Sequence, residues 1–138
     1  MITRHCPKRR IFWVVFEDRM TLDSHWFHWF LSPGFYHCWV FYGAKAGTVA
    51  LHPLRNTWGL EWMPCDPHEF AQALYEHPEH RYKILVIDRS TRFDYTLRGV
   101  ITCVSVVKAC LNVRGWAITP KQLYKHLLKL GAIEVGDA

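Results

Sequence analysis

The sequence predicts an α+β fold, in which an antiparallel sheet of about five or six strands packs against helices. Short segments rich in β-branched and aromatic residues, separated by turn residues, fill most of the chain before residue 92. Two segments with helical spacing of apolar residues follow them. The length of 138 residues is that of one ordinary domain, so we expect 1–138 to form a single domain with its own apolar core.

The expected strands are the runs in which β-branched and aromatic residues dominate. They are Arg10–Phe16, Phe35–Tyr42, Thr48–Leu51 (with an extension to His52 left open), Thr57–Met63 and Tyr82–Asp88. Alternation along the second of these runs divides its side chains between two faces of the sheet. One face carries His37, Trp39 and Phe41, and the other carries Cys38, Val40 and Tyr42.

Two short helices are expected before the last third of the chain. The segment Asp18–Pro33 should contain one of them, ended by Ser32-Pro33-Gly34. The other should begin after Asp66, because Asp66 can cap it, Pro67 suits the first helical position and Glu69 can complete a capping box.

The last third predicts two longer helices. The first is expected over Thr102–Val113 and packs on the sheet, because Val104, Val107 and Leu111 recur at helical spacing. The second begins at Thr119-Pro120-Lys121-Gln122, which combines a cap, a first-turn proline and a glutamine in the box position. Its inward residues are Leu123, Leu127 and Leu130, its outward residues are Lys121, Lys125 and Lys129, and Gly131 ends it.

Composition and charge exclude several classes of protein. Half of the residues are hydrophobic and 21% are charged, so a disordered chain is excluded. No apolar run reaches the roughly 18–20 residues of a membrane-spanning helix, and strand-like residues rather than a cleavage site follow the basic start, so we expect no membrane span and no signal peptide. The net charge is +5, but the basic residues are scattered and not interleaved with aromatic ones, which argues against nucleic-acid binding.

The five cysteines indicate a reducing compartment such as the cytoplasm. Their odd number and the absence of a C-x-x-C pair argue against a disulfide framework and a zinc ribbon. Cys38 and Cys65 could pair with each other or lie in the core, and Cys110 is expected to be buried.

Cys103 is the strongest candidate for chemistry. It falls in the first turn of the expected helix Thr102–Val113, where unpaired backbone N–H groups and the helix dipole stabilise a thiolate. The same N–H groups could stabilise an oxyanion after attack on a carbonyl. The alternative is that Cys103 is a small buried residue at a helix–sheet contact.

A nucleophilic cysteine needs a base, and His37 lies in an otherwise apolar strand where its ring requires a partner. A satisfied core histidine is the alternative. His52 and Glu61 both remain candidates for a third residue that orients the imidazole: Glu61 offers the better charge, and His52 lies closer along the hairpin.

Three further patterns carry weaker hypotheses. The pairs His25/His28 and His77/His80 have one-turn spacing but no third ligand near them in sequence, so we expect no metal site. The aromatic segment Trp26–Phe30 could be a substrate rim, a contact for a protein partner, or core.

Several of these segments resemble the circularly permuted papain-like proteins, the NlpC-type superfamily that includes lecithin retinol acyltransferase. The resemblance rests on Phe35-Tyr36-His37-Cys38-Trp39-Val40-Phe41, on a strand ending His52-Pro53, and on Thr102-Cys103-Val104 at the start of a Val/Lys-rich helix. It covers roughly residues 25–130. The segments 29–38 and 118–124 are especially similar to small phage-encoded members.

The resemblance implies a permuted papain-like arrangement with Cys103 as nucleophile, His37 as base and His52 as third polar residue. It also implies a cysteine hydrolase or acyltransferase that acts on an amide or ester through an acyl-enzyme, without metal or cofactor. A peptide, peptidoglycan or acyl group would be the substrate, and a phage-associated cell-wall peptidase is one form of this activity. The alternative function is a non-catalytic structural or adaptor subunit of a larger assembly such as a phage virion. Thr102 stands where the family often has Asn or another polar residue.

Overall fold

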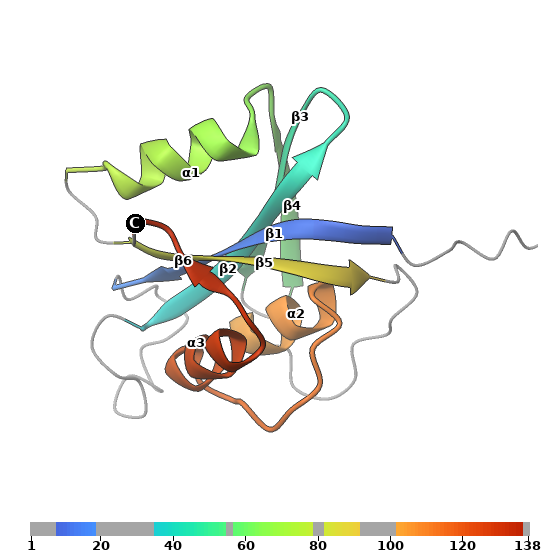
Figure 1. Ribbon diagram of the computed structural model, residues 1–138, viewed down its shortest axis with the longest axis vertical. Coiled ribbons are helices and arrows are strands. Elements are labelled where there is room, and N and C mark those ends of the chain that lie inside the picture. The colour runs from blue at the N-terminus through green and yellow to red at the C-terminus, as the bar shows by residue number, and fades with distance from the viewer. Residues whose placement is uncertain (1–7, 19–34, 55–56, 79–81, 92–101, 137–138) are drawn as a thin grey trace, which may run out of the picture.

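One sheet of six antiparallel strands forms the centre of the structure, a computed structural model that describes residues 8–18, 35–54, 57–78, 82–91 and 102–136. The strands are β1 (Lys8–Glu17), β2 (His37–Ala44), β3 (Gly47–Leu54), β4 (Thr57–Met63), β5 (Tyr82–Thr91) and β6 (Ile133–Glu134). Their order across the sheet is β4-β3-β2-β1-β5-β6 (Figure 1). The predicted α+β class and antiparallel sheet are confirmed.

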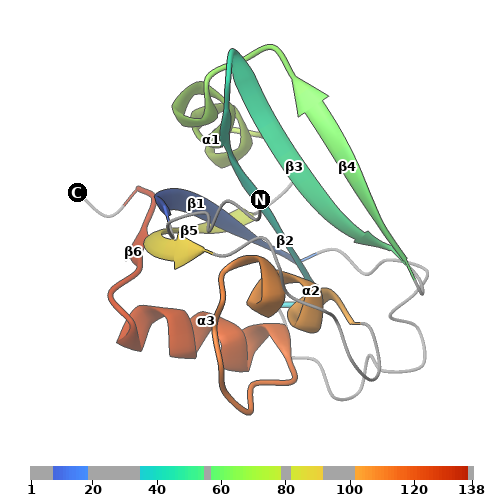
Figure 2. The ribbon, with the colours of Figure 1, turned by 90° about the vertical axis from the view of Figure 1, so that its right-hand side faces the viewer.

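Helices cover both faces of this sheet. Helix α1 (Pro67–Tyr75) lies on one face, and helices α2 (Cys103–Cys110) and α3 (Pro120–Lys129) lie on the other (Figures 1 and 2). Figure 2 shows the β3–β4 hairpin rising on the side of α1. The two faces therefore have separate apolar cores, one beneath α1 and one beneath α2 and α3.

The predicted alternation along β2 is confirmed by the membership of these two cores. Trp39 and Phe41 pack on the α1 side, where the Trp13 and Phe41 rings stack with centroids 5.4 Å apart. Cys38 and Val40 pack on the opposite side, together with α2 and α3. Burial of several such aromatic and aliphatic groups on each face is the main favourable term for folding.

Helices α1 and α3 begin after the predicted caps Asp66 and Thr119, whereas α2 begins one residue after the expected start at Thr102 and ends three residues before the expected end at Val113. Asp66 caps α1, although its carboxylate accepts from the backbone N–H of His68 at 2.8 Å rather than from that of Glu69. Thr102 caps α2 and Thr119 caps α3, and both complete reciprocal capping boxes. The starts of α2 and α3 are therefore fixed by local side-chain hydrogen bonds.

The structure also corrects some expectations. Leu123 and Leu127 are fully buried, but Leu130 is 42% exposed, because α3 ends there and the chain turns away at Gly131.

β6 was not predicted, since a strand of two residues has no readable period and forms only by pairing with Leu85 and Val86 of β5. The helix expected within Asp18–Pro33 lies outside the described residues, apart from Asp18 itself.

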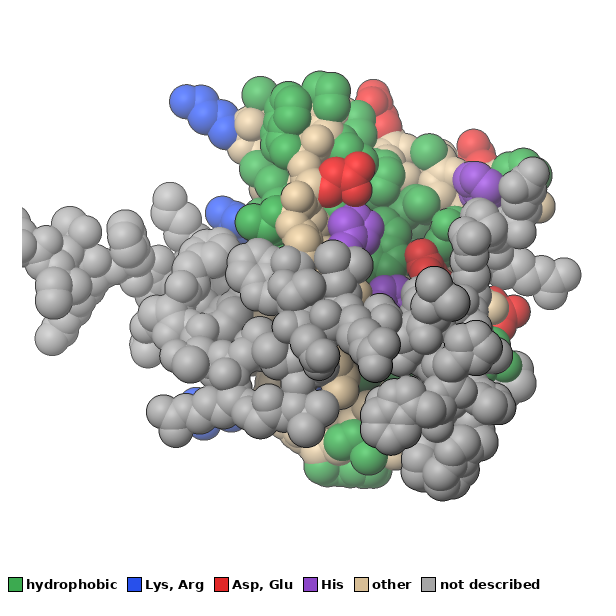
Figure 3. Space-filling model, turned by 180° about the vertical axis from the view of Figure 1, so that it is seen from behind, with side chains coloured by type: hydrophobic (Ala, Val, Ile, Leu, Met, Phe, Trp, Pro, Cys, Tyr) green, Lys and Arg blue, Asp and Glu red, His purple; other side chains and the backbone are tan. Residues whose placement is uncertain are grey.

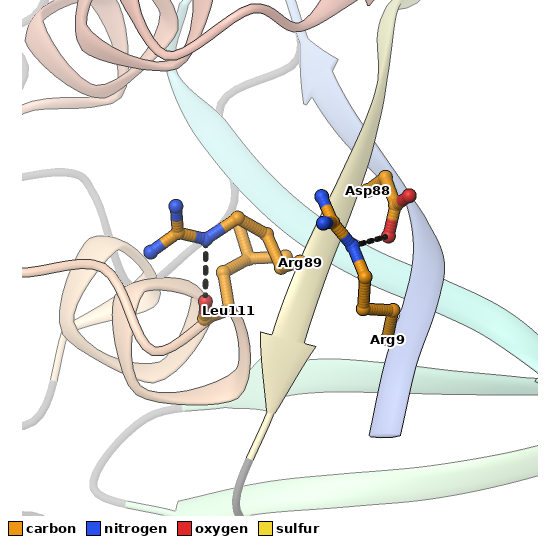
Figure 4. Close-up of polar contacts among 4 residues, drawn as sticks. All are labelled: Arg9, Asp88, Arg89 and Leu111. Atoms are coloured by element: carbon orange, nitrogen blue, oxygen red, sulfur yellow. Dashed lines mark hydrogen bonds and ion pairs between the residues drawn. The ribbon is translucent and has the colours of Figure 1, made fainter. Parts of the chain in front are cut away.

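Helix α2 is held at its far end by a side chain from the sheet. Arg89 on β5 donates from Nε to the carbonyl oxygen of Leu111 at 3.1 Å and from Nη2 to that of Asn112 at 2.8 Å. Figure 4 shows Arg89 reaching across to Leu111, beside the separate Arg9–Asp88 pair that joins β1 to β5. A cation at the carbonyl end of a helix is favourable, so Arg89 helps to fix α2 on the sheet.

None of the helices in the described part of the chain has both the length and the apolar character that crossing a bilayer requires.

Candidate active site

Cys103 is the first residue of α2, and its side chain is partly exposed. Thr102 accepts a hydrogen bond at Oγ1 from the backbone N–H of Ser105 at 3.1 Å, and its own backbone N–H donates to Ser105 Oγ at 2.7 Å. These two bonds set the backbone of the first turn. Cys103 packs against the core on the α2 side of the sheet, where Cys38 lies.

The sulfur of Cys103 has hydrogen-bonding partners on the neighbouring strand. They are the thiol of Cys38, the side chain of His37 and the backbone N–H of Cys38. The bond from the Cys38 thiol contributes most to holding the pKa of Cys103 well below its usual range, and the bond and charge of His37 add to it. Burial acts in the opposite direction but does not prevail, so the site favours a thiolate at Cys103.

The pKa of Cys38 is shifted in the opposite direction. It is fully buried, and burial raises its pKa well above the usual value, helped by its neighbour Cys103 and by the charge of Glu17. Cys38 therefore keeps its proton in the pH range where Cys103 is ionised. The pair behaves as a thiol that donates to a thiolate, which is the stronger, charge-assisted kind of hydrogen bond.

His37 is the first residue of β2 and lies opposite Glu17 of β1 in the strand register. Alternation assigns His37 to the α1 face with Trp39, whereas Cys103 packs on the α2 face. Because His37 stands at the end of its strand, its ring still reaches the start of α2 and hydrogen-bonds Cys103. The structure thus brings together two of the three residues that the sequence analysis selected.

The third residue, His52, lies next to the other candidate, Glu61. The Nε2 atom of His52 is 3.1 Å from Oε2 of Glu61, and the two side chains are 33% and 59% exposed. The His52 ring also lies against the indole of Trp39, with centroids 4.8 Å apart. The two residues proposed to orient His37 therefore contact each other, and the partner of the His52 ring on β2 is Trp39.

A carboxylate that the sequence analysis did not select lies on the same face as His37. Glu17 accepts a hydrogen bond at Oε1 from Nε1 of Trp39 at 2.9 Å. It is partly buried at the end of β1, one residue beyond the expected strand Arg10–Phe16. Cys38 was also missed as part of the site, although the predicted alternation already placed it on the face opposite to that of His37 and Trp39.

The remaining candidates fall elsewhere. Cys38 does not pair with Cys65: both thiols are free, and Cys38 contacts Cys103. Cys110 is the last residue of α2 and is buried in the core, as expected. The ring of His77 lies beside that of Tyr82, with centroids 6.3 Å apart. The residues Cys6, His25, His28, His80 and the segment Trp26–Phe30 lie outside the described residues.

Histidine and acidic side chains lie near one another, among apolar side chains, on the face shown in Figure 3. Within the described ranges, no group of three or more His, Cys, Asp or Glu side chains is arranged to hold a metal ion. The arrangement that the structure does show is a polarised thiol with an imidazole beside it, which suits nucleophilic attack on a carbonyl.

No family model, no curated protein and no solved structure matches the chain.

Proposed function

We propose that the protein is a cysteine-dependent hydrolase or acyltransferase that acts on an amide or ester bond. The observation that carries this proposal is the set of hydrogen bonds from His37 and Cys38 to the sulfur of Cys103 at the first turn of α2. A thiol that only filled space at a helix–sheet contact would not need an imidazole or a second thiol as donors.

The first step is acylation. His37 takes the proton of the Cys103 thiol, and the resulting thiolate attacks the substrate carbonyl carbon. The carbonyl π electrons move to the oxygen and form a tetrahedral oxyanion. When the C–N or C–O bond breaks, its electrons stay with the leaving group, which receives the proton from His37. Cys103 is then bound to the acyl group as a thioester.

The second step removes the acyl group. Water or another nucleophile attacks the thioester carbonyl, and His37 accepts its proton. The S–C bond breaks and returns the thiolate, which His37 and Cys38 again stabilise. With water the reaction is a hydrolysis, and with an amine or hydroxyl acceptor it is an acyl transfer.

The first turn of α2 supplies donors for the oxyanion. The opening N–H groups of a helix have no carbonyl partner within the helix, and they point along its axis away from the chain. The Ser105 N–H donates to the Thr102 hydroxyl and the Val106 N–H to the Thr102 carbonyl, so the N–H groups of Cys103 and Val104 are the candidate donors in this turn. Donors of this kind contribute on the order of 10²–10³ in kcat when they meet the developing charge.

The resemblance to permuted papain-like proteins adds finer proposals. It supports a permuted papain-like arrangement, since the strand with His37 precedes the helix with Cys103 in the chain. It also supports a peptide or peptidoglycan stem peptide as substrate, and a cytoplasmic or virion-associated location for a phage protein.

A simple activated ester tests the chemistry without knowledge of the natural substrate. The protein is incubated with p-nitrophenyl acetate, and the released nitrophenolate and the mass of the protein are followed. We expect an early burst and a single acetyl group on Cys103. Cys103→Ala should abolish both, and His37→Ala should slow the burst by about 10²-fold or more, the usual contribution of a general base.

Cys65→Ala is the matched control, because Cys65 is a second partly exposed cysteine away from His37. It should behave as the wild type. Acetylation spread over several cysteines, or a burst that survives Cys103→Ala, would contradict the proposal. Release of soluble peptides from purified peptidoglycan by the wild type but not by Cys103→Ala would support the cell-wall substrate.

A further inference from the structure

We infer that Glu17 is the positioning residue for His37, taking the place that the sequence analysis gave to His52 or Glu61. This inference rests on the proposed function, because it names the group that orients the base of the same site. It follows from three relationships in the sheet: the register of β1 on β2, the hydrogen bond from Trp39 to Glu17, and the direction of His52.

The strand register places Glu17 nearer to His37 than His52 is. Glu17 and His37 are direct partners across the β1–β2 pair. Direct partners of an antiparallel pair have their Cβ atoms about 4.5–5.5 Å apart on the same face of the sheet. In the β2–β3 register, Val40 is opposite Leu51, so His52 continues opposite Trp39 and is only a diagonal neighbour of His37, about 7–8 Å away.

Trp39 fixes the Glu17 carboxylate at this position. Its indole N–H donates to Glu17 Oε1 at 2.9 Å, and its side chain is only 5% exposed. The indole is rigid and held in the core beneath α1, so it limits the rotamers of Glu17. One carboxylate oxygen is engaged by this bond, and the strand register keeps the carboxylate group on the face that His37 shares.

His52 is directed away from His37 by its own partner. Glu61 on β4 is opposite Ala50, whereas Gly59 is opposite His52. The contact between Nε2 of His52 and Oε2 of Glu61, at 3.1 Å, therefore draws the ring toward the Ala50 end of β3. That is the end of β3 farther from His37, since the β2–β3 register runs antiparallel.

The titratable groups around His37 are of two kinds. On the thiol side are Cys103 from α2 and Cys38 from β2 itself. On the sheet side are Glu17 from β1, Tyr82 from β5, which is opposite Glu17, and His52 from β3 as the diagonal neighbour. Among these groups Glu17 is the carboxylate, the group whose ionised form can balance an imidazolium.

A carboxylate in this position acts on the base in two ways. It favours the charged imidazolium, which keeps Cys103 ionised as its partner, and it restricts rotation of the ring so that one nitrogen faces the sulfur. Removing this charge should therefore weaken the imidazolium of His37 and, through it, the thiolate of Cys103.

The test is the pH dependence of the reaction of Cys103 with iodoacetamide, measured residue by residue in the whole protein. Glu17→Gln keeps the size of the side chain and an oxygen that can accept from Trp39, but removes the charge. We expect it to slow alkylation of Cys103 about tenfold at the low pH where the wild-type rate begins to rise. The whole curve of rate against pH should move to higher pH. Glu17→Asp keeps the charge and should restore most of the rate.

Glu61→Gln and His52→Gln are the matched controls, because they break the neighbouring His52–Glu61 contact. Both should leave the profile where the wild type has it. A profile that moves in these two variants and not in Glu17→Gln overturns the inference and makes His52 the orienter, while the proposed function stands. If His37→Ala also leaves the profile unmoved, the proposed function itself fails, which is a different result.

Discussion

The thiol of Cys38 hydrogen-bonds the sulfur of Cys103, and this contact joins the second residue of β2 to the first residue of α2. Strand and helix come from distant parts of the chain, so the contact depends on how α2 packs on the sheet. It places a protonated, buried thiol against an ionisable one. The consequences can be measured at a single residue, since alkylation and mass spectrometry report each cysteine separately.

Cys38→Ala is expected to make Cys103 less acidic. The change removes the bond that lowers the pKa of Cys103 most, so the thiolate loses its strongest donor. A hydrogen bond to a charged group is worth roughly 1.5–3 kcal/mol, so its loss should raise the pKa of Cys103. Iodoacetamide labelling of Cys103 should therefore begin at higher pH. Cys110→Ala removes the other thiol of α2, which is buried, and should not change the pH at which labelling of Cys103 begins.

In the wild-type protein, the alkylation rate of Cys103 should rise at lower pH than that of an ordinary cysteine. The thiolate is the reactive form, so alkylation rises as the pH climbs through the pKa of the thiol. Because the pKa of Cys103 is lowered, this rise should be complete below the range of an ordinary cysteine, near 8.5. The raised pKa of Cys38 predicts the reverse, with no labelling of the folded protein at neutral pH. A Cys103 profile centred near 8.5 would contradict the account of the site.

Variants of the two capping-box threonines should have similar effects on the free energy of unfolding but different effects on the reactivity of Cys103. Thr102→Ala and Thr119→Ala each remove a capping-box hydroxyl, from α2 and α3 respectively. Each should lower the free energy of unfolding by about 1 kcal/mol, measured by urea denaturation. Only Thr102→Ala loosens the turn that carries Cys103, so only this variant should slow its alkylation. Equal effects of the two variants on alkylation would show that the first turn of α2 does not shape the site.

Two arginines on neighbouring strands give a second matched pair. Arg89→Gln removes a cation that donates to two carbonyl oxygens at the end of α2, whereas Arg9→Gln removes an exposed ion pair with Asp88. We expect a loss of about 1–2 kcal/mol in unfolding free energy for Arg89→Gln and less than about 1 kcal/mol for Arg9→Gln. Losses of the same size would mean that Arg89 does not hold α2 on the sheet.

The strands and helix caps could be predicted because their signals are local. Five of the six strands follow from runs of β-branched and aromatic residues, and Asp66 and Thr119 are recognisable as caps from the residues that follow them. β6 could not be found in this way, because it is defined only by its pairing with β5. Leu130 fits the helical period, yet it is exposed because the helix ends there.

The nucleophile and the base of the site could be predicted from the sequence, but the residues that contact them could not. Cys103 and His37 could be selected because a helix start and an isolated polar ring in an apolar strand are visible in sequence. Cys38 and Glu17 could not, since their importance depends on the packing of α2 and on the register of β1 against β2. A cysteine in a core strand and a glutamate at a strand end look like ordinary structural residues until the strands are aligned.

The most direct test of the account is a competition among the cysteines for a limiting amount of iodoacetamide at pH 7, in the folded wild type and in His37→Ala. We expect Cys103 to be labelled first in the wild type, and its labelling to slow by an order of magnitude or more in His37→Ala, because the thiolate loses the imidazole beside it. Equal labelling of the accessible cysteines, or a rate at Cys103 that does not change without His37, would contradict the claim that this thiol and this imidazole act together.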